Sequence, residues 1–324
     1  MLQLSPAPHI TSPKNIKKIM YGVVGALIPV LIGSVYFFGW RALFLCSLSV
    51  LSAIFTEWIF QRVTNRDIRC LDGSAIITGI LVAFNIPVNS PWWLPVVGSF
   101  FAVFIVKQLF GGLGYNIFNP ALAGRAFLVA SWPSLMTGNW TPPINGTLSG
   151  IPVLDGMTQA TPLSLLIMKP NLNVIQSLNS PTMIKTLFIG NTGGCIGETS
   201  ALLLLIGALF LFIMGYADWR ISLSYIGSIF VITGIFYFLG VTPVNPVFHI
   251  FSGGVMLGGL FMATDMVTSP VTLKGRWIFG ICGGVLCVIL RLWAGYPEGV
   301  SYSILIMNMF VPLLDRLQVR IFGR

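Results

Sequence analysis

The sequence predicts an all-α polytopic membrane protein with about ten transmembrane helices. Of its 324 residues, 55% are hydrophobic and only 8% are charged, whereas ordinary soluble domains carry about 25% charged residues. So few charges cannot cover a water-exposed surface, and lipid must therefore be the main solvent of the chain. The 35 glycines agree with this interpretation, because small residues let membrane helices approach one another closely.

Ten apolar stretches are long enough to cross, or nearly cross, a bilayer core roughly 30 Å thick. The first stretch follows a lysine cluster and resembles a signal sequence, but it is long enough to span the membrane and lacks a small-residue cleavage site. We expect it to be retained as the first transmembrane helix. The predicted spans lie near residues 20–39, 42–60, 74–87, 94–110, 117–132, 199–216, 221–239, 250–265, 277–295 and 300–314.

Basic residues are distributed unevenly between the two predicted faces of the membrane. With the N-terminus inside, fourteen of the 18 lysines and arginines fall on the inner side, and only Arg41, Lys169, Lys185 and Arg291 fall outside. Cytoplasmic loops carry an excess of lysine and arginine. Both termini are therefore predicted to be cytoplasmic. The net charge of +9 reflects this orientation and does not indicate nucleic-acid binding.

The chain shows signs of an internal repeat. Trp40-Arg41 is followed by Gly79, and Trp219-Arg220 by Gly258, in each case 38 residues after the arginine. We predict two inverted five-helix repeats, 1–132 and 199–324, with the polar loop 133–198 outside the membrane. Five is an odd number, so the two halves must have opposite orientations. Chance similarity between glycine-rich apolar segments is the alternative. Paired short spans in such repeats commonly line a central site.

Two carboxylates fall at the ends of predicted spans, where burying a charge is costly. Asp265 ends the eighth span. It is either an interfacial residue near Lys274 and Arg276 or part of an ion-coupling region. Glu198 opens the sixth span. It either stabilises the helix N-terminus through the helix dipole or takes part in ion coupling.

Other polar residues have structural interpretations. Arg125, in the fifth span, is expected to extend to the interface, and Asp72 is expected to cap the third span. The two histidines and five cysteines show no metal-ligand spacing, and the sequence has no phosphate-binding loop or nucleophile–base pair. The residues alone therefore leave a channel, a transporter, an assembly scaffold and a redox subunit open.

Three motifs favour one of these classes by resemblance. They are GGLGYNIFNPA at 111–121 followed by Gly124-Arg125, GNTGGCIGETS at 190–200, and FMATD at 261–265 followed by Thr268-Ser269-Pro270. They resemble the family formed by the RnfD component of the Rnf ion-translocating electron-transport complex and the NqrB component of the sodium-translocating NADH:quinone reductase. The resemblance covers essentially the whole chain. It favours the Rnf branch, since the quinone-reductase component usually has a longer N-terminal extension.

This resemblance implies a covalent flavin. Members of the family carry FMN in a phosphoester to a threonine that ends an Asp-x-x-Ser/Thr-Gly-Ala-Thr motif. Residues 155–161 read DGMTQAT, so Thr161 matches the acceptor, and Asp155, Thr158 and Ala160 match residues recognised by a flavin transferase. Gln159 stands where the family usually has glycine. The alternative is an ordinary turn. Because no evident base activates the threonine, attachment is expected to need a separate transferase outside the cell.

The resemblance also implies a role within a larger assembly. We expect a flavoprotein subunit of the bacterial inner membrane that relays electrons between iron–sulfur and flavin subunits and contributes to Na⁺ or H⁺ translocation. A second, non-covalent flavin is compatible with this role. The sequence has no nucleotide-binding glycine loop and no cysteine cluster, so ferredoxin and NAD are expected to bind partner subunits, and the chain should show no turnover alone. The alternatives are the quinone-reductase component and, from a different class, a solute channel or transporter.

Overall fold

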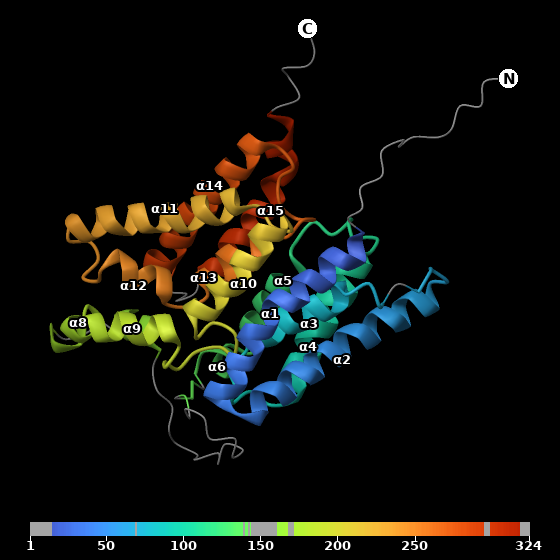
Figure 1. Ribbon diagram of the computed structural model, residues 1–324, viewed down its shortest axis with the longest axis horizontal. Coiled ribbons are helices and arrows are strands. Elements are labelled where there is room, and N and C mark those ends of the chain that lie inside the picture. The colour runs from blue at the N-terminus through green and yellow to red at the C-terminus, as the bar shows by residue number, and fades with distance from the viewer. Residues whose placement is uncertain are drawn as a thin grey trace, which may run out of the picture.

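The computed structural model describes residues 15–68, 70–138, 140–141, 143, 161–167, 172–294 and 299–317, and the regular elements in these ranges are all helices (Figure 1). Every predicted span contains helical residues. The helices of the first half are α1 (Ile16–Phe38), α2 (Trp40–Val63), α3 (Ser74–Phe84), α4 (Trp93–Phe101), the π-helix η1 (Ala102–Gln108) and α5 (Pro120–Ser131). Those of the second half are α10 (Ala201–Met214), α11 (Trp219–Phe238), α12 (Pro246–Phe251), α13 (Val255–Leu257), the π-helix η2 (Gly258–Met262), α14 (Leu273–Trp293) and α15 (Val300–Arg316).

Helix length separates two kinds of span. The helices α1, α2, α11 and α14 are long and apolar enough to cross a membrane, whereas 74–84, 93–108, 120–131 and 201–214 are shorter apolar helices. The short helix α3 is almost entirely buried, so it needs no full-length contact with lipid. These features support a multi-pass membrane protein.

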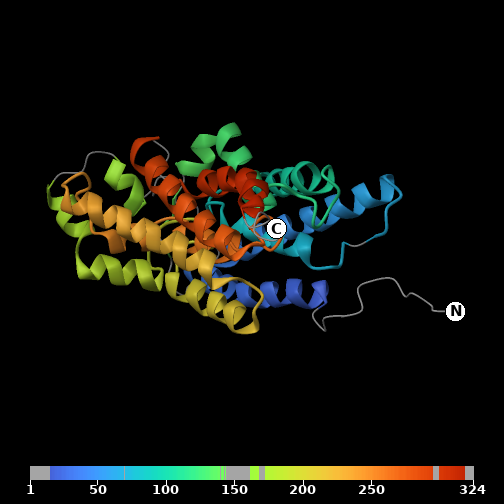
Figure 2. The ribbon, with the colours of Figure 1, turned by 90° about the horizontal axis from the view of Figure 1, so that it is seen from above.

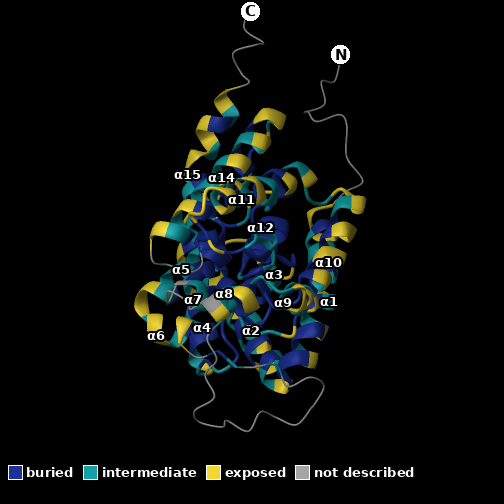
Figure 3. Ribbon diagram, turned by 90° about the vertical axis from the view of Figure 1, so that its left-hand side faces the viewer, coloured by how far each residue is buried: buried dark blue, intermediate teal, exposed yellow. Residues whose placement is uncertain are grey.

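The two halves of the chain pack directly against each other. The helices α1 and α10 lie side by side (Figure 2), and Gly207 of α10 leaves no room for a Cβ next to the carbonyl oxygen of Ala26. The most buried residues gather along the middle of the molecule (Figure 3). The start of α1 and the end of α15 lie at the same end of the bundle (Figure 1). The inverted repeat itself stays a prediction.

The eighth span is interrupted, contrary to the single helix expected over 250–265. Helix α12 ends at Phe251, and α13 begins only at Val255. Between them Gly253 adopts a φ of 66°, a left-handed conformation that favours glycine. The break brings the backbone of 252–254 next to the cavity described below.

Short helices follow α5 in the predicted polar loop. They are α6 (Pro133–Thr137), α7 (Pro162–Ile167), α8 (Leu172–Leu178) and α9 (Pro181–Ile189). Leu163, Leu178 and Leu187 form a small separate core with Val244 and Phe248, on and just before α12. This core anchors the described part of the loop on the second half of the chain, and it thereby fixes the position of Thr161.

Candidate functional site

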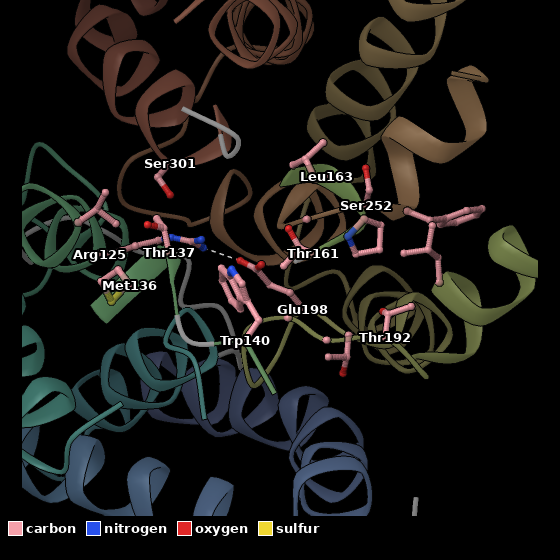
Figure 4. A pocket seen from close by; sticks show the side chains of 18 of the residues that line it. Arg125, Met136, Thr137, Trp140, Thr161, Leu163, Thr192, Glu198, Ser252 and Ser301 are labelled. Atoms are coloured by element: carbon pink, nitrogen blue, oxygen red, sulfur yellow. Dashed lines mark hydrogen bonds and ion pairs between the residues drawn. The ribbon is translucent and has the colours of Figure 1, made fainter. Parts of the chain in front are cut away.

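Thr161 lies at the edge of a cavity of about 920 Å³, part of which is open to solvent (Figure 4). We call it the Thr161 cavity. Its walls come from α5, from the loop before α7, from the segment before α10 and from the break after α12. The polar and aromatic lining includes Arg125, Trp140, Thr192, Glu198, Phe251, Ser252, Ser301 and Tyr302.

An ion pair between Arg125 and Glu198 forms one wall of this cavity (Figure 4). Both side chains are buried. Arg125 Nη1 donates to Glu198 Oε1 and to Asn85 Oδ1, and Nη2 lies 3.9 Å from the sulfur of Cys195. The expectation that Arg125 extends to the membrane interface was therefore wrong. The charge of the buried guanidinium is compensated by the carboxylate of Glu198.

Glu198 lies three residues before the start of α10 and is not its N-cap. Helix α10 begins at Ala201, and its N-cap is Ser200, whose Oγ accepts a hydrogen bond from the backbone N of Leu203 at 3.4 Å. The segment before α10 instead pairs with the end of α3. The backbone N atoms of Ile196 and Gly197 donate to the carbonyl oxygens of Ile86 and Phe84, at 3.1 and 2.9 Å. This pairing holds Glu198 opposite Arg125.

Asp265 lines a second cavity, which we call the Asp265 cavity. Its other polar lining residues are Ser74, Thr78, Lys107, Asn116, Asn119, Tyr216 and Thr264. Asp265 Oδ2 accepts a hydrogen bond from Thr268 Oγ1 at 3.1 Å. Arg276, one of its expected partners, pairs with Asp218 instead. Within the described residues, Asp265 forms no ion pair.

A buried ion pair behind the Asp265 cavity was not identified from the sequence. Lys107 and Glu57 are each 1% exposed, and Lys107 Nζ lies 2.9 Å from Glu57 Oε2. Lys107 also donates to Ser74 Oγ at 2.6 Å, and Ser74 Oγ donates to Asp72 Oδ1 at 2.5 Å. Asp72 also accepts from the first backbone N of α3 at 2.8 Å, but the N-cap of α3 is Gly73, so the expectation that Asp72 caps this helix was wrong. The signal available in the sequence was Glu57, an unexplained carboxylate inside an apolar span.

The two cavities lie toward opposite ends of shared helices. Pro120 and Ala121 of α5 line the Asp265 cavity, whereas Ala126 and Val129 line the Thr161 cavity. Thr199, just before α10, lines the Thr161 cavity, and Leu211 of α10 lines the other.

A series of contacts runs between the two cavities. Asn85, which accepts from Arg125, also places its Nδ2 3.8 Å from the sulfur of Met262. The carbonyl oxygen of Met262 accepts a hydrogen bond from Asn119 Nδ2 at 3.1 Å, and Asn119 lines the Asp265 cavity. Successive contacts therefore run from the wall of one cavity to the wall of the other, through Arg125, Asn85, Met262 and Asn119.

The structure brings Thr161 and Glu198 to one cavity and places Asp265 in another. Asp155, Thr158 and Ala160 lie outside the described residues. The role of these three residues in recognition by the flavin transferase therefore stays a prediction.

Almost the whole chain matches one family and several known proteins. The family model described as NQR2, RnfD, RnfE family matches residues 3–323. The D component of the Na(+)-translocating ferredoxin:NAD(+) oxidoreductase complex of Acetobacterium woodii is 46% identical, over 99% of this chain and 95% of its own. The proton-translocating counterpart of Clostridium ljungdahlii is 40% identical, over 97% and 93%. The D component of the ion-translocating oxidoreductase complex of Stutzerimonas stutzeri is 36% identical, over 96% and 93%.

Proposed function

Since the chain belongs to the NQR2, RnfD, RnfE family, we propose that it is the membrane flavoprotein subunit of an Rnf-type ferredoxin:NAD oxidoreductase complex. In this proposal it relays electrons through FMN joined to Thr161 and contributes to the translocation of Na⁺ or H⁺. The observation that supports it best is the position of Thr161, at a cavity with a buried ion pair and aromatic walls.

The lining of the Thr161 cavity suits a flavin chemically. Ligand cavities combine apolar walls with a few polar groups. Trp140 and Phe251 offer apolar surface to a flat ring system, and Arg125 and Ser252 offer donors to its polar edge or its phosphate. When bound, FMN supplies the redox chemistry, and the protein supplies position and electrostatics.

The residues of this chain then have distinct tasks. Thr161 tethers the cofactor, and the core of Leu163, Leu178 and Leu187 holds the tether against α12. Glu198 fixes the guanidinium of Arg125 at the cavity wall. Within the described residues, no group of three or more His, Cys, Asp or Glu side chains could hold a metal ion. As part of the proposal, we assign the iron–sulfur centres, ferredoxin and NAD to partner subunits.

Denaturing-gel fluorescence under ultraviolet light tests the covalent flavin directly. In a host that has the flavin transferase, the wild-type chain should give a fluorescent band, because only covalently held flavin survives denaturation. Thr161→Ala should abolish this band at unchanged expression. A dark wild-type band would contradict the proposal and favour a solute channel or transporter of the same fold.

The same preparation tests the second, non-covalent flavin. Flavin released into solution when the complex is denatured should come in addition to the covalent band, and its amount should not change in Thr161→Ala. Release of no flavin would limit the cofactors to the covalent FMN.

A further inference from the structure

A buried pair of opposite charges forms part of the wall of the Thr161 cavity. Arg125 is 5% exposed and Glu198 is 8% exposed. Both side chains line this cavity together with Thr161 (Figure 4). Charges away from bulk water act over several ångströms, because few solvent dipoles screen them. A group bound in the cavity is therefore exposed to the field of both side chains.

Contacts on two sides fix the carboxylate of Glu198. On one side, Oε1 accepts a hydrogen bond from Arg125 Nη1. On the other side lies the break after α12, where a Cβ on Gly254 would lie 2.6 Å from Oε1 and 3.2 Å from Cδ of Glu198. Glycine at position 254 therefore leaves room for the carboxylate, and the backbone of the break holds it at the cavity wall.

The position of Arg125 does not depend on Glu198 alone. Its guanidinium also donates to Asn85 Oδ1, and Nη2 lies 3.9 Å from the sulfur of Cys195. Glutamine is nearly the same size as glutamate, so Glu198→Gln leaves these contacts of Arg125 in place. The substitution therefore removes one negative charge from the cavity wall and changes little else.

We propose that Glu198 lowers the midpoint potential of the flavin joined to Thr161. The proposal rests on the proposed function and adds to it a residue that sets the driving force of the electron relay. Reduction by one electron from an iron–sulfur partner adds one negative charge to the cavity, unless a proton accompanies the electron. A carboxylate in the cavity wall repels this added charge, so it favours the oxidised form of the flavin.

A redox titration of the assembled complex tests the proposal. The absorbance of oxidised flavin is followed while dithionite is added, and subtracting the same titration of the matching Thr161→Ala complex isolates the flavin on Thr161. In Glu198→Gln the equilibrium should shift about tenfold toward the reduced flavin, which is a rise of about 59 mV for one electron. Glu198→Asp keeps the charge and should restore most of the wild-type potential. An unchanged potential in Glu198→Gln would overturn the proposal.

Glu57 provides a matched control. Its carboxylate is also buried and also pairs with a cation, since Oε2 lies 2.9 Å from Lys107 Nζ. Glu57 is not among the described residues that line the Thr161 cavity. Glu57→Gln should therefore leave the potential of this flavin unchanged. An equal rise in both variants would show a general change in the protein and would overturn the specific role of Glu198.

A second variant leaves Glu198 intact and decides the case if Glu198→Gln fails to assemble. Ser301 lines the same cavity and is the second residue of α15. Aspartate is favourable in the first turn of a helix, because it interacts with the helix dipole. Ser301→Asp adds a negative charge to the wall and should lower the potential. An unchanged potential would overturn the proposal, whereas the proposed function fails differently, through a wild-type chain without covalent flavin.

Discussion

The carboxylate of Asp265 reaches a cavity without forming an ion pair to any described lysine or arginine. Its oxygens accept local hydrogen bonds, from Thr268 Oγ1 at 3.1 Å and from the backbone N of Val267 at 3.5 Å. A carboxylate that faces a protein-lined cavity is a suitable transient ligand for Na⁺ or H⁺. We propose that Asp265 belongs to the ion-coupling region. Glu198 is less suited to this role, because Arg125 already neutralises it.

The substitution Asp265→Asn tests this role in the assembled complex. We expect electron transfer to persist while ion accumulation in vesicles falls by roughly tenfold, because an amide carries no charge to compensate a cation. Both quantities are measured on the same vesicles. Asp218→Asn is the control, since Asp218 pairs with Arg220 and Arg276. If both activities stay unchanged, or fall together with assembly, Asp265 is structural.

The sequence could identify single buried charges but not their partners. Arg125 and Glu198 are 73 residues apart, and Lys107 and Glu57 are 50 residues apart. Hydropathy shows that each charge is costly within a span, yet the choice of partner depends on which helices pack together. The motifs around Arg125 and Glu198 were recognised only as separate signatures. Thr161 differs, because the residues around it in the chain already form a recognisable motif.

At the scale of helices, Gly79 allows the close packing of α2 and α3. A Cβ there would lie 2.6 Å from Cα and 3.0 Å from N of Val50, in the backbone of α2. Ser49 Oγ adds a hydrogen bond to the carbonyl oxygen of Gly79 at 2.6 Å. Gly79→Ala should therefore destabilise the protein by about 1–3 kcal/mol, because the two helices must separate.

Thermal denaturation of the detergent-solubilised protein measures this effect. Gly25→Ala is the matched control, since a Cβ on Gly25 meets no heavy atom within 4 Å. Its melting temperature should be unchanged or slightly raised, because alanine favours the helix. Equal melting temperatures for the two variants would contradict the close packing of α2 and α3.

Helix position was more predictable than helix continuity. Each of the ten predicted spans contains helical residues, because apolar length is the dominant signal for helices in a membrane protein. The break at 252–254 was missed, since its Ser-Gly-Gly sequence is apolar enough to continue a span and resembles glycines used only for packing.

At the scale of the whole molecule, the charge distribution predicts the orientation in the membrane. A cysteine introduced at Gly146 should react with an impermeant reagent added to intact cells, and one introduced at Arg66 should react only after the cells are opened. Native background should be low, because Cys46, Cys70, Cys195 and Cys287 are buried and Cys282 is only partly exposed. The reverse labelling pattern would refute the orientation, and the flavin transferase could then not reach Thr161.

The contacts of Asn85, Met262 and Asn119 between the two cavities have a consequence for energy conversion. An electron can tunnel across a few packed side chains, but a cation cannot follow, because it would lose its hydration shell without replacement ligands. In the proposed redox subunit, we therefore expect these contacts to favour the passage of electrons over that of Na⁺ between the two cavities. Such selectivity would limit a short circuit, in which ions return across the membrane through the same protein that carries the current.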